Sequence, residues 1–92
     1  MAKLNVQLPG LLSPVVAGRL NFPIEAPTLR GALETIRRDQ PCLGLHLFAE
    51  NGELRQHVLC FLNGTNTRWL DDLELPVKNG DTLLFMQAVS GG

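Results

Sequence analysis

The sequence has no excess of charge of either sign. Its 92 residues include 8 lysines and arginines against 9 aspartates and glutamates, for a formal net charge of −1. A protein that grips nucleic acid through its phosphates needs a clear surplus of basic side chains. The near balance therefore argues against a nucleic-acid partner.

Long hydrophobic runs are missing as well. No apolar stretch approaches the roughly 20 residues that cross a bilayer. Residues 1–5, ahead of Pro9, are too few and too polar for a secretory signal. We therefore expect no membrane association and a cytoplasmic location.

Residues that bind metals or act as nucleophiles are scarce. There are two cysteines and two histidines, and Cys42 and Cys60 fit neither a disulfide framework nor a zinc-binding spacing. We interpret Cys60 as a small buried hydrophobic residue, His46 as a loop residue and His57 as a strand residue facing solvent. No glycine-rich phosphate loop joins a strand to a helix. We expect no metal site and no bound cofactor, so the chain is poorly equipped to be an enzyme.

Alternation of apolar and polar residues predicts the first two strands. Leu4, Val6 and Leu8 alternate with polar residues, and a similar run occupies 20–25. Pro23 removes one hydrogen-bond donor from the second run, which places that strand at a sheet edge or a bulge. The two runs predict a hairpin with a long connection.

A helix is predicted over 28–39, with Thr28 as its N-cap and Pro41 as its limit. Residues 42–53 give mixed signals and no clear element. The apolar residues of the helix recur with the helical period and form one stripe. They are Leu29, Ala32, Leu33 and Ile36.

The second half of the chain predicts further strands. The strongest covers 55–62 and ends at a tight turn formed by Asn63 and Gly64. A short returning strand is predicted at 67–69, and the last strand at 82–88.

One helix with a single apolar stripe must be covered by one face of a sheet. The order strand, strand, helix, strand, short strand, strand predicts an α+β, ubiquitin-like β-grasp fold with a mixed sheet of four to five strands. With 45% hydrophobic residues, the chain can fill one core. We expect a single domain over 1–88 and a flexible tail over 89–92.

The tail consists of small residues that follow the last strand almost directly. Val89 and Ser90 lead to Gly91 and Gly92, and two glycines make a thread narrow enough to enter a channel. One interpretation is a frayed terminus. The other is that the Gly92 carboxylate is the reacting group, after a partner activates it by adenylation.

The last strand also predicts an apolar outer face. If Leu83 points inward, then Leu84 and Met86 point outward, beside Leu59 and Phe61. Four adjacent apolar side chains form a patch of the size that binds partners. The alternative is that loops of the chain itself cover them.

At this point the sequence resembles the MoaD/ThiS family of ubiquitin-like sulfur carriers. The resemblance is carried by 58–64 (VLCFLNG), 79–83 (NGDTL) and 88–92 (AVSGG), and 27–30 (PTLR) fits the helix start. It covers nearly the whole chain in element order, while the specific motifs lie in the C-terminal third.

The resemblance implies a protein co-substrate whose Gly92 is adenylated by an E1-like adenylyltransferase of the MoeB/ThiF type. Sulfur transfer then gives a thiocarboxylate, and an acceptor enzyme takes the sulfur. ATP and zinc are expected on the activating enzyme. Val89, Ser90 and Gly91 thread its channel, and the outer face docks partners. We expect a monomer when free.

Several branches of the family stay open. Segments 48–55 (FAENGELR) and 88–92 resemble the CysO-type carriers of cysteine biosynthesis, whose acceptor is a cysteine synthase-type enzyme. A molybdopterin synthase small subunit, which serves the large subunit, is an alternative. A ubiquitin-like modifier conjugated to lysines through Gly92 uses the same activation. A binding module with an accidental ending is the remaining alternative.

Overall fold

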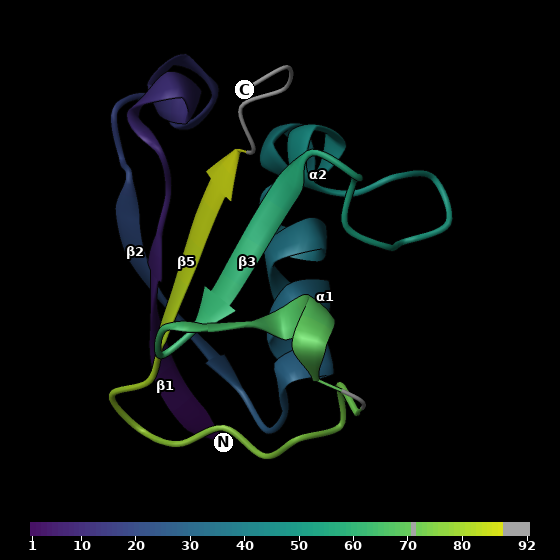
Figure 1. Ribbon diagram of the computed structural model, residues 1–92. Coiled ribbons are helices and arrows are strands. Elements are labelled where there is room, and N and C mark those ends of the chain that lie inside the picture. The colour runs from purple at the N-terminus through teal and green to yellow at the C-terminus, as the bar shows by residue number, and fades with distance from the viewer. Residues whose placement is uncertain (71, 88–92) are drawn as a thin grey trace.

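The computed structural model describes residues 1–70 and 72–87. Five strands form one mixed sheet in the order β2-β1-β5-β3-β4 (Figure 1). β5, the middle strand, pairs parallel with β1 and antiparallel with β3. The strands are β1 (Ala2–Gln7), β2 (Asn21–Ala26), β3 (Val58–Leu62), β4 (Thr65–Asn66) and β5 (Thr82–Gln87).

β1 and β2 form the predicted hairpin, joined through the short 3-10 helix η1 (Gly10–Val16). Pro23 lies opposite Asn5. The N–H of Asn5 points away from β2 and donates to the carbonyl of Asp81 at 2.9 Å. The Asn5–Pro23 pair therefore exchanges no hydrogen bonds, and the nitrogen of Pro23 faces the open edge. The prediction of an edge strand is confirmed, and the missing donor leaves the ladder intact.

Two α-helices follow β2. α1 (Leu29–Asp39) begins as predicted, with the hydroxyl of Thr28 accepting from the N–H of Gly31 at 3.1 Å. α2 (Pro41–Leu47) occupies part of the segment with mixed signals, and its proline sits in the first turn, where a helix needs no N–H. The prediction that His46 lies in a loop is wrong, because it belongs to α2.

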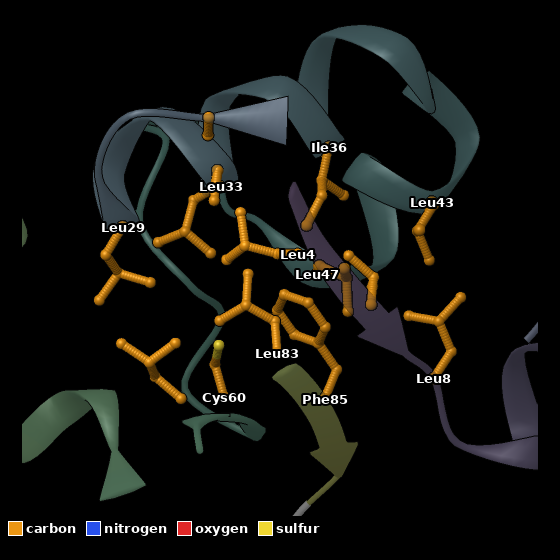
Figure 2. Packing of buried hydrophobic residues seen from close by; sticks show 14 of the residues in the cluster. Leu4, Leu8, Leu29, Leu33, Ile36, Leu43, Leu47, Cys60, Leu83 and Phe85 are labelled. Carbon is orange, nitrogen blue, oxygen red and sulfur yellow. The ribbon is translucent and has the colours of Figure 1, made fainter. Parts of the chain in front are cut away.

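Both helices pack on the same face of the sheet. Figure 2 shows Leu29, Ile36 and Leu43 meeting Phe85 and the other side chains of that face. The inward register predicted for β3 and β5 is confirmed. The buried cluster comprises Leu4, Val6, Leu8, Leu12, Phe22, Ala26, Leu29, Ala32, Leu33, Ile36, Leu43, Leu47, Phe48, Val58, Cys60, Leu62, Val77, Leu83 and Phe85.

The tight turn after β3 is also confirmed. Asn63 and Gly64 both adopt positive φ, 50° and 87°, as a two-residue hairpin requires. The returning strand β4 is shorter and earlier than predicted. Residues 67–69, predicted as that strand, form the 3-10 helix η2, because the Asn66 side chain accepts from the N–H of Arg68 at 2.9 Å and caps it.

β3 begins later than predicted, at Val58 rather than at 55. Nη2 of Arg68 donates to the carbonyls of Arg55, Gln56 and Val58 at 2.8, 3.0 and 2.9 Å. These carbonyls converge on one guanidinium, and the segment before Val58 turns instead of extending. His57 therefore lies exposed in a turn, and its predicted place on the strand is wrong.

The sheet, with its helices on one face, is the predicted ubiquitin-like β-grasp arrangement. β5 is described as far as Gln87, so the last residue of the predicted strand and the predicted 89–92 tail lie outside the described residues. Within residues 1–70 and 72–87, no helix combines the length and apolar character needed to cross a membrane.

Neighbouring residues on opposite faces of β5 should differ sharply in their effect on stability. Phe85 is 0% exposed and Met86 is 46% exposed. We expect Phe85→Ala to lower the free energy of unfolding by about 3–5 kcal/mol through lost burial and a cavity. Met86→Ala should lower it by less than about 1 kcal/mol. Urea unfolding measures both, and equal losses would contradict the assigned register.

Candidate functional site

The predicted reactive end, Gly92, lies outside the described residues, as do Val89, Ser90 and Gly91. The structure does describe the strand that leads to it. β5 is hydrogen-bonded on both sides, and its last described residue, Gln87, lies opposite Val58 of β3. Residues 88–92, which include Gly92, come directly after it in the sequence. The candidate site is therefore the end of the middle strand.

A turn tied to β1 holds the start of β5. The N–H of Lys3 donates to Oδ1 of Asn79 at 2.8 Å, and the N–H of Gly80 donates to the carbonyl of Lys3 at 2.9 Å. Gly80 has φ +90°, a conformation that favours glycine. The Asn-Gly dipeptide thus sets the place where β5 joins β1.

Asp81 ties the same turn to the β3–β4 hairpin. Its carboxylate accepts from the N–H of Lys78 at 2.7 Å and from Nδ2 of Asn63 at 2.9 Å. Oδ1 of Asn63 in turn accepts from the N–H of Thr82 at 2.9 Å. The Lys78 N–H, and then Asn63, hold the pKa of Asp81 below its ordinary value. Two motifs that the sequence presents as separate turns are therefore one structural unit.

The predicted outer face is assembled by the register of β3 and β5. Leu59 lies opposite Met86, and Phe61 lies opposite Leu84. Met86 is exposed, and the other three are half-buried. Gln7 pairs with Leu84 on one side and Asn66 pairs with Phe61 on the other, so the apolar face has polar borders. Its role in docking stays a prediction.

The two thiols lie in opposite environments. Cys60 is buried on β3, and its burial raises the pKa of the thiol to about 12, an effect that a hydrogen bond with Thr67 partly opposes. Cys42 is exposed on α2. The interpretation of Cys60 as a buried hydrophobic residue is confirmed.

The described residues contain no group of three or more His, Cys, Asp or Glu side chains placed to hold a metal ion. A groove of about 870 Å³ lies beside α1. Its charged lining consists of Arg30, Glu34, Arg37, Glu53, Arg68 and Asp72. Arg30 pairs with Glu74, and Arg68 is occupied by backbone carbonyls. Because both acidic and basic side chains line the groove, its charge favours neither an anionic nor a cationic ligand.

A comparison with protein families shows which family the chain belongs to. The family model described as the ThiS family matches residues 6–92. The chain belongs to the ThiS family. Members of this family are small sulfur carrier proteins, generally not catalysts. The resemblance carried by the three sequence motifs is confirmed.

Individual relatives of this ThiS-family chain agree with the assignment. A protein of Archaeoglobus fulgidus, named as a candidate sulfur carrier, is 35% identical over 46 residues, 50% of this chain and 52% of that relative. The match thus spans about half the length of each protein.

Solved structures also match this chain over nearly their full length, and two of them have 25% identity or more. The solution structure of small archaeal modifier protein 1 from Methanosarcina acetivorans is 28% identical with a TM-score of 0.81, covering 100% of this chain and 98% of that one. A chain in the crystal structure of the Amycolatopsis orientalis BexX/CysO complex is 25% identical with a TM-score of 0.80, covering 97% and 99%. Both share the β-grasp fold.

The Asp81 network predicts a pH-dependent contribution to stability. Because the pKa of Asp81 is lowered on folding, its contribution is present above about pH 4 and is lost as the pH falls through the folded-state pKa. We expect Asp81→Asn to cost about 1 kcal/mol at pH 7, allowing for its contact with solvent. The cost should shrink towards zero as the pH falls through that folded-state pKa. Unfolding at pH 7 and at a series of acidic pH values measures it, and a pH-independent cost would contradict the assignment.

The thiols should react very differently in the folded protein. With a pKa of about 12, Cys60 is almost entirely protonated at pH 8, and a protonated thiol is not nucleophilic. We expect Ellman's reagent to titrate one thiol, Cys42, in the native chain and both in denaturant. Two fast-reacting thiols in the native chain would refute the burial of Cys60.

Proposed function

We propose that this ThiS-family chain carries sulfur on its C-terminal glycine. An E1-like adenylyltransferase joins the AMP of ATP to the Gly92 carboxylate and releases pyrophosphate. A sulfide-level donor then displaces AMP and leaves a thiocarboxylate. An acceptor enzyme takes the sulfur, and water restores the carboxylate. ATP and zinc are bound by the activating enzyme, not by this chain.

The family match carries the proposal, because it runs through residue 92 and so includes the four small residues of the tail. A carboxylate is a poor acyl donor until it is activated, and adenylation supplies the leaving group. Val89, Ser90 and Gly91 separate Gly92 from the domain with little bulk. The chain is thus suited to be a substrate of other enzymes.

The outer face supplies a surface on which partners dock. Leu59, Phe61, Leu84 and Met86 lie together and are bordered by polar side chains. An apolar patch with a polar rim is the usual anatomy of a protein interface. Met86, the most exposed of the four, has a flexible side chain that adapts to more than one partner.

The acceptor we favour is of the cysteine synthase type. The likeness to a chain of the BexX/CysO complex, at 25% identity over nearly the whole chain, supports the CysO-type branch. The molybdopterin synthase large subunit is the alternative acceptor.

Mass spectrometry tests the chemistry directly. After incubation with ATP, sulfide and an E1-like activating enzyme, the chain should gain about 16 Da, because sulfur replaces one oxygen. Deletion of Gly92 leaves the described domain intact and is the matched control, which should show no gain. No gain in the wild-type chain with any activating enzyme would refute the proposal.

The likeness to small archaeal modifier protein 1, at 28% identity over the whole chain, favours a second candidate, a modifier conjugated to lysines through Gly92. Denaturing gels of cell extract, probed for this chain, separate the two functions. A ladder of high-mass conjugates that disappears on deletion of Gly92 supports the modifier. A single band at the mass of the free chain supports the carrier.

A further inference from the structure

The end of the sheet at which β5 finishes is bordered by two other elements. β1 and β5 run parallel, so their C-terminal ends lie at the same edge, and η1 follows β1 directly. α2 packs against η1. Figure 1 shows β5 finishing between η1 and α2. Any chain that continues beyond Gln87 therefore starts beside both.

Each of these elements exposes one leucine. Leu11 of η1 is 67% exposed and Leu45 of α2 is 71% exposed. Their neighbours Leu12, Leu43 and Leu47 are buried and hold the two elements against the core. The two leucines are thus presented to solvent by firmly anchored backbone. We call Leu11 and Leu45 the tail rim.

The segments that carry the tail rim contain few charged groups. None of the chain's 8 lysines and arginines or 9 aspartates and glutamates falls within 4–18 or 40–49, although Nε of Arg55 donates to the carbonyl of Leu45 at 2.9 Å. Residues 88–92 carry no charged side chain, and the charge of the tail is that of the Gly92 carboxylate. The exposed leucine side chains match a partner surface that is likewise apolar, because a charge buried against them would be unpaired.

The length of the tail brings the tail rim into contact with any enzyme that acts on Gly92. Five residues, 88–92, reach at most about 18 Å from Gln87 even when fully extended. An enzyme with a recessed reaction centre must therefore bring the mouth of its channel against the end of β5. The elements η1 and α2, which border that end, then lie beside the mouth of the channel.

We propose that the tail rim is a docking surface for the activating adenylyltransferase, and that the mouth of that enzyme's channel is apolar and uncharged where it meets Leu11 and Leu45. This inference rests on the proposed function. The tail rim lies at the end of the sheet, whereas the four-residue patch of the proposed function lies on its outer face. The tail rim thus adds affinity at the place where the tail enters.

The matched control is Leu75, an apolar residue that is 39% exposed at the other end of the molecule. Its carbonyl accepts from the N–H of Leu29, which begins α1 just after the end of β2. Because β2 runs antiparallel to β1, that end is opposite to the end of β5. Leu75→Ser should leave activation unchanged.

The experiment measures adenylation of the full chain by pyrophosphate exchange with the activating enzyme of the mass assay. We expect the Leu11→Ser/Leu45→Ser double variant to raise the KM for the carrier at least tenfold, with kcat within about twofold, because the reacting tail is unchanged. The Leu11→Met/Leu45→Met variant should restore the KM. Thermal unfolding should not change, since both leucines are exposed.

The outcomes separate the two proposals. If the wild-type chain is adenylated and the double serine variant has the same KM as Leu75→Ser, the tail-rim proposal is overturned and the carrier function stands. If no activating enzyme adenylates the wild-type chain, both proposals are overturned.

A second measurement needs no change at the tail rim. Cys42 is exposed on α2, three residues before Leu45, and Cys60 is buried, so a benzophenone maleimide attaches at Cys42. Irradiation with the activating enzyme should give a covalent adduct. The Cys42→Ser/Leu75→Cys chain, labelled at the opposite end, should give none. No adduct from Cys42, or equal adducts from both chains, would overturn the tail-rim proposal.

Discussion

The parallel pairing of β1 with β5 is the constraint on which the rest of the molecule depends. It places β5 in the middle of the sheet. It also makes residues 8–81 the connection that leads from the end of β1 to the start of β5. The turn at Asn79 and Gly80 fixes where the pairing starts, and Asp81 joins it to the β3–β4 hairpin. The direction in which the chain leaves the domain therefore follows from contacts made at the opposite end of β5.

Local sequence patterns predicted most of the fold. A strand with one buried face alternates apolar and polar residues, and this alternation can be recognised in the sequence. This period of two residues predicts that Cys60 and Leu83 point inward, and the outer face follows from the same register. Features that depend on distant partners could not be predicted. Arg68 decides where β3 begins by binding carbonyls ten to thirteen residues earlier, and Asn63 meets Asp81 across the sheet. α2 is short and leucine-rich, so its pattern fits more than one period.

The motifs that identify the family have two different roles, one in the structure of the fold and one in the proposed chemistry. The Asn-Gly turns and Asp81 are structural, since their side chains and backbone are engaged in hydrogen bonds within the fold. The proposed chemistry uses the carboxylate of a glycine, which needs no side chain for it. A family of sulfur carriers can therefore keep its fold signature and its reacting group in separate parts of the sequence, and the surfaces between them are free to select partners.

The position of β5 also has a consequence for how the domain forms. The strands that come first along the chain make one hairpin, those in the middle make another, and only β5 connects the two. Each hairpin therefore has an unpaired edge until β5, the last of the five strands to be translated, pairs with it. The core cannot be complete before β5 is in place, because Leu83 and Phe85 belong to it. A partner that selects the finished sheet thereby meets only chains that have completed their fold.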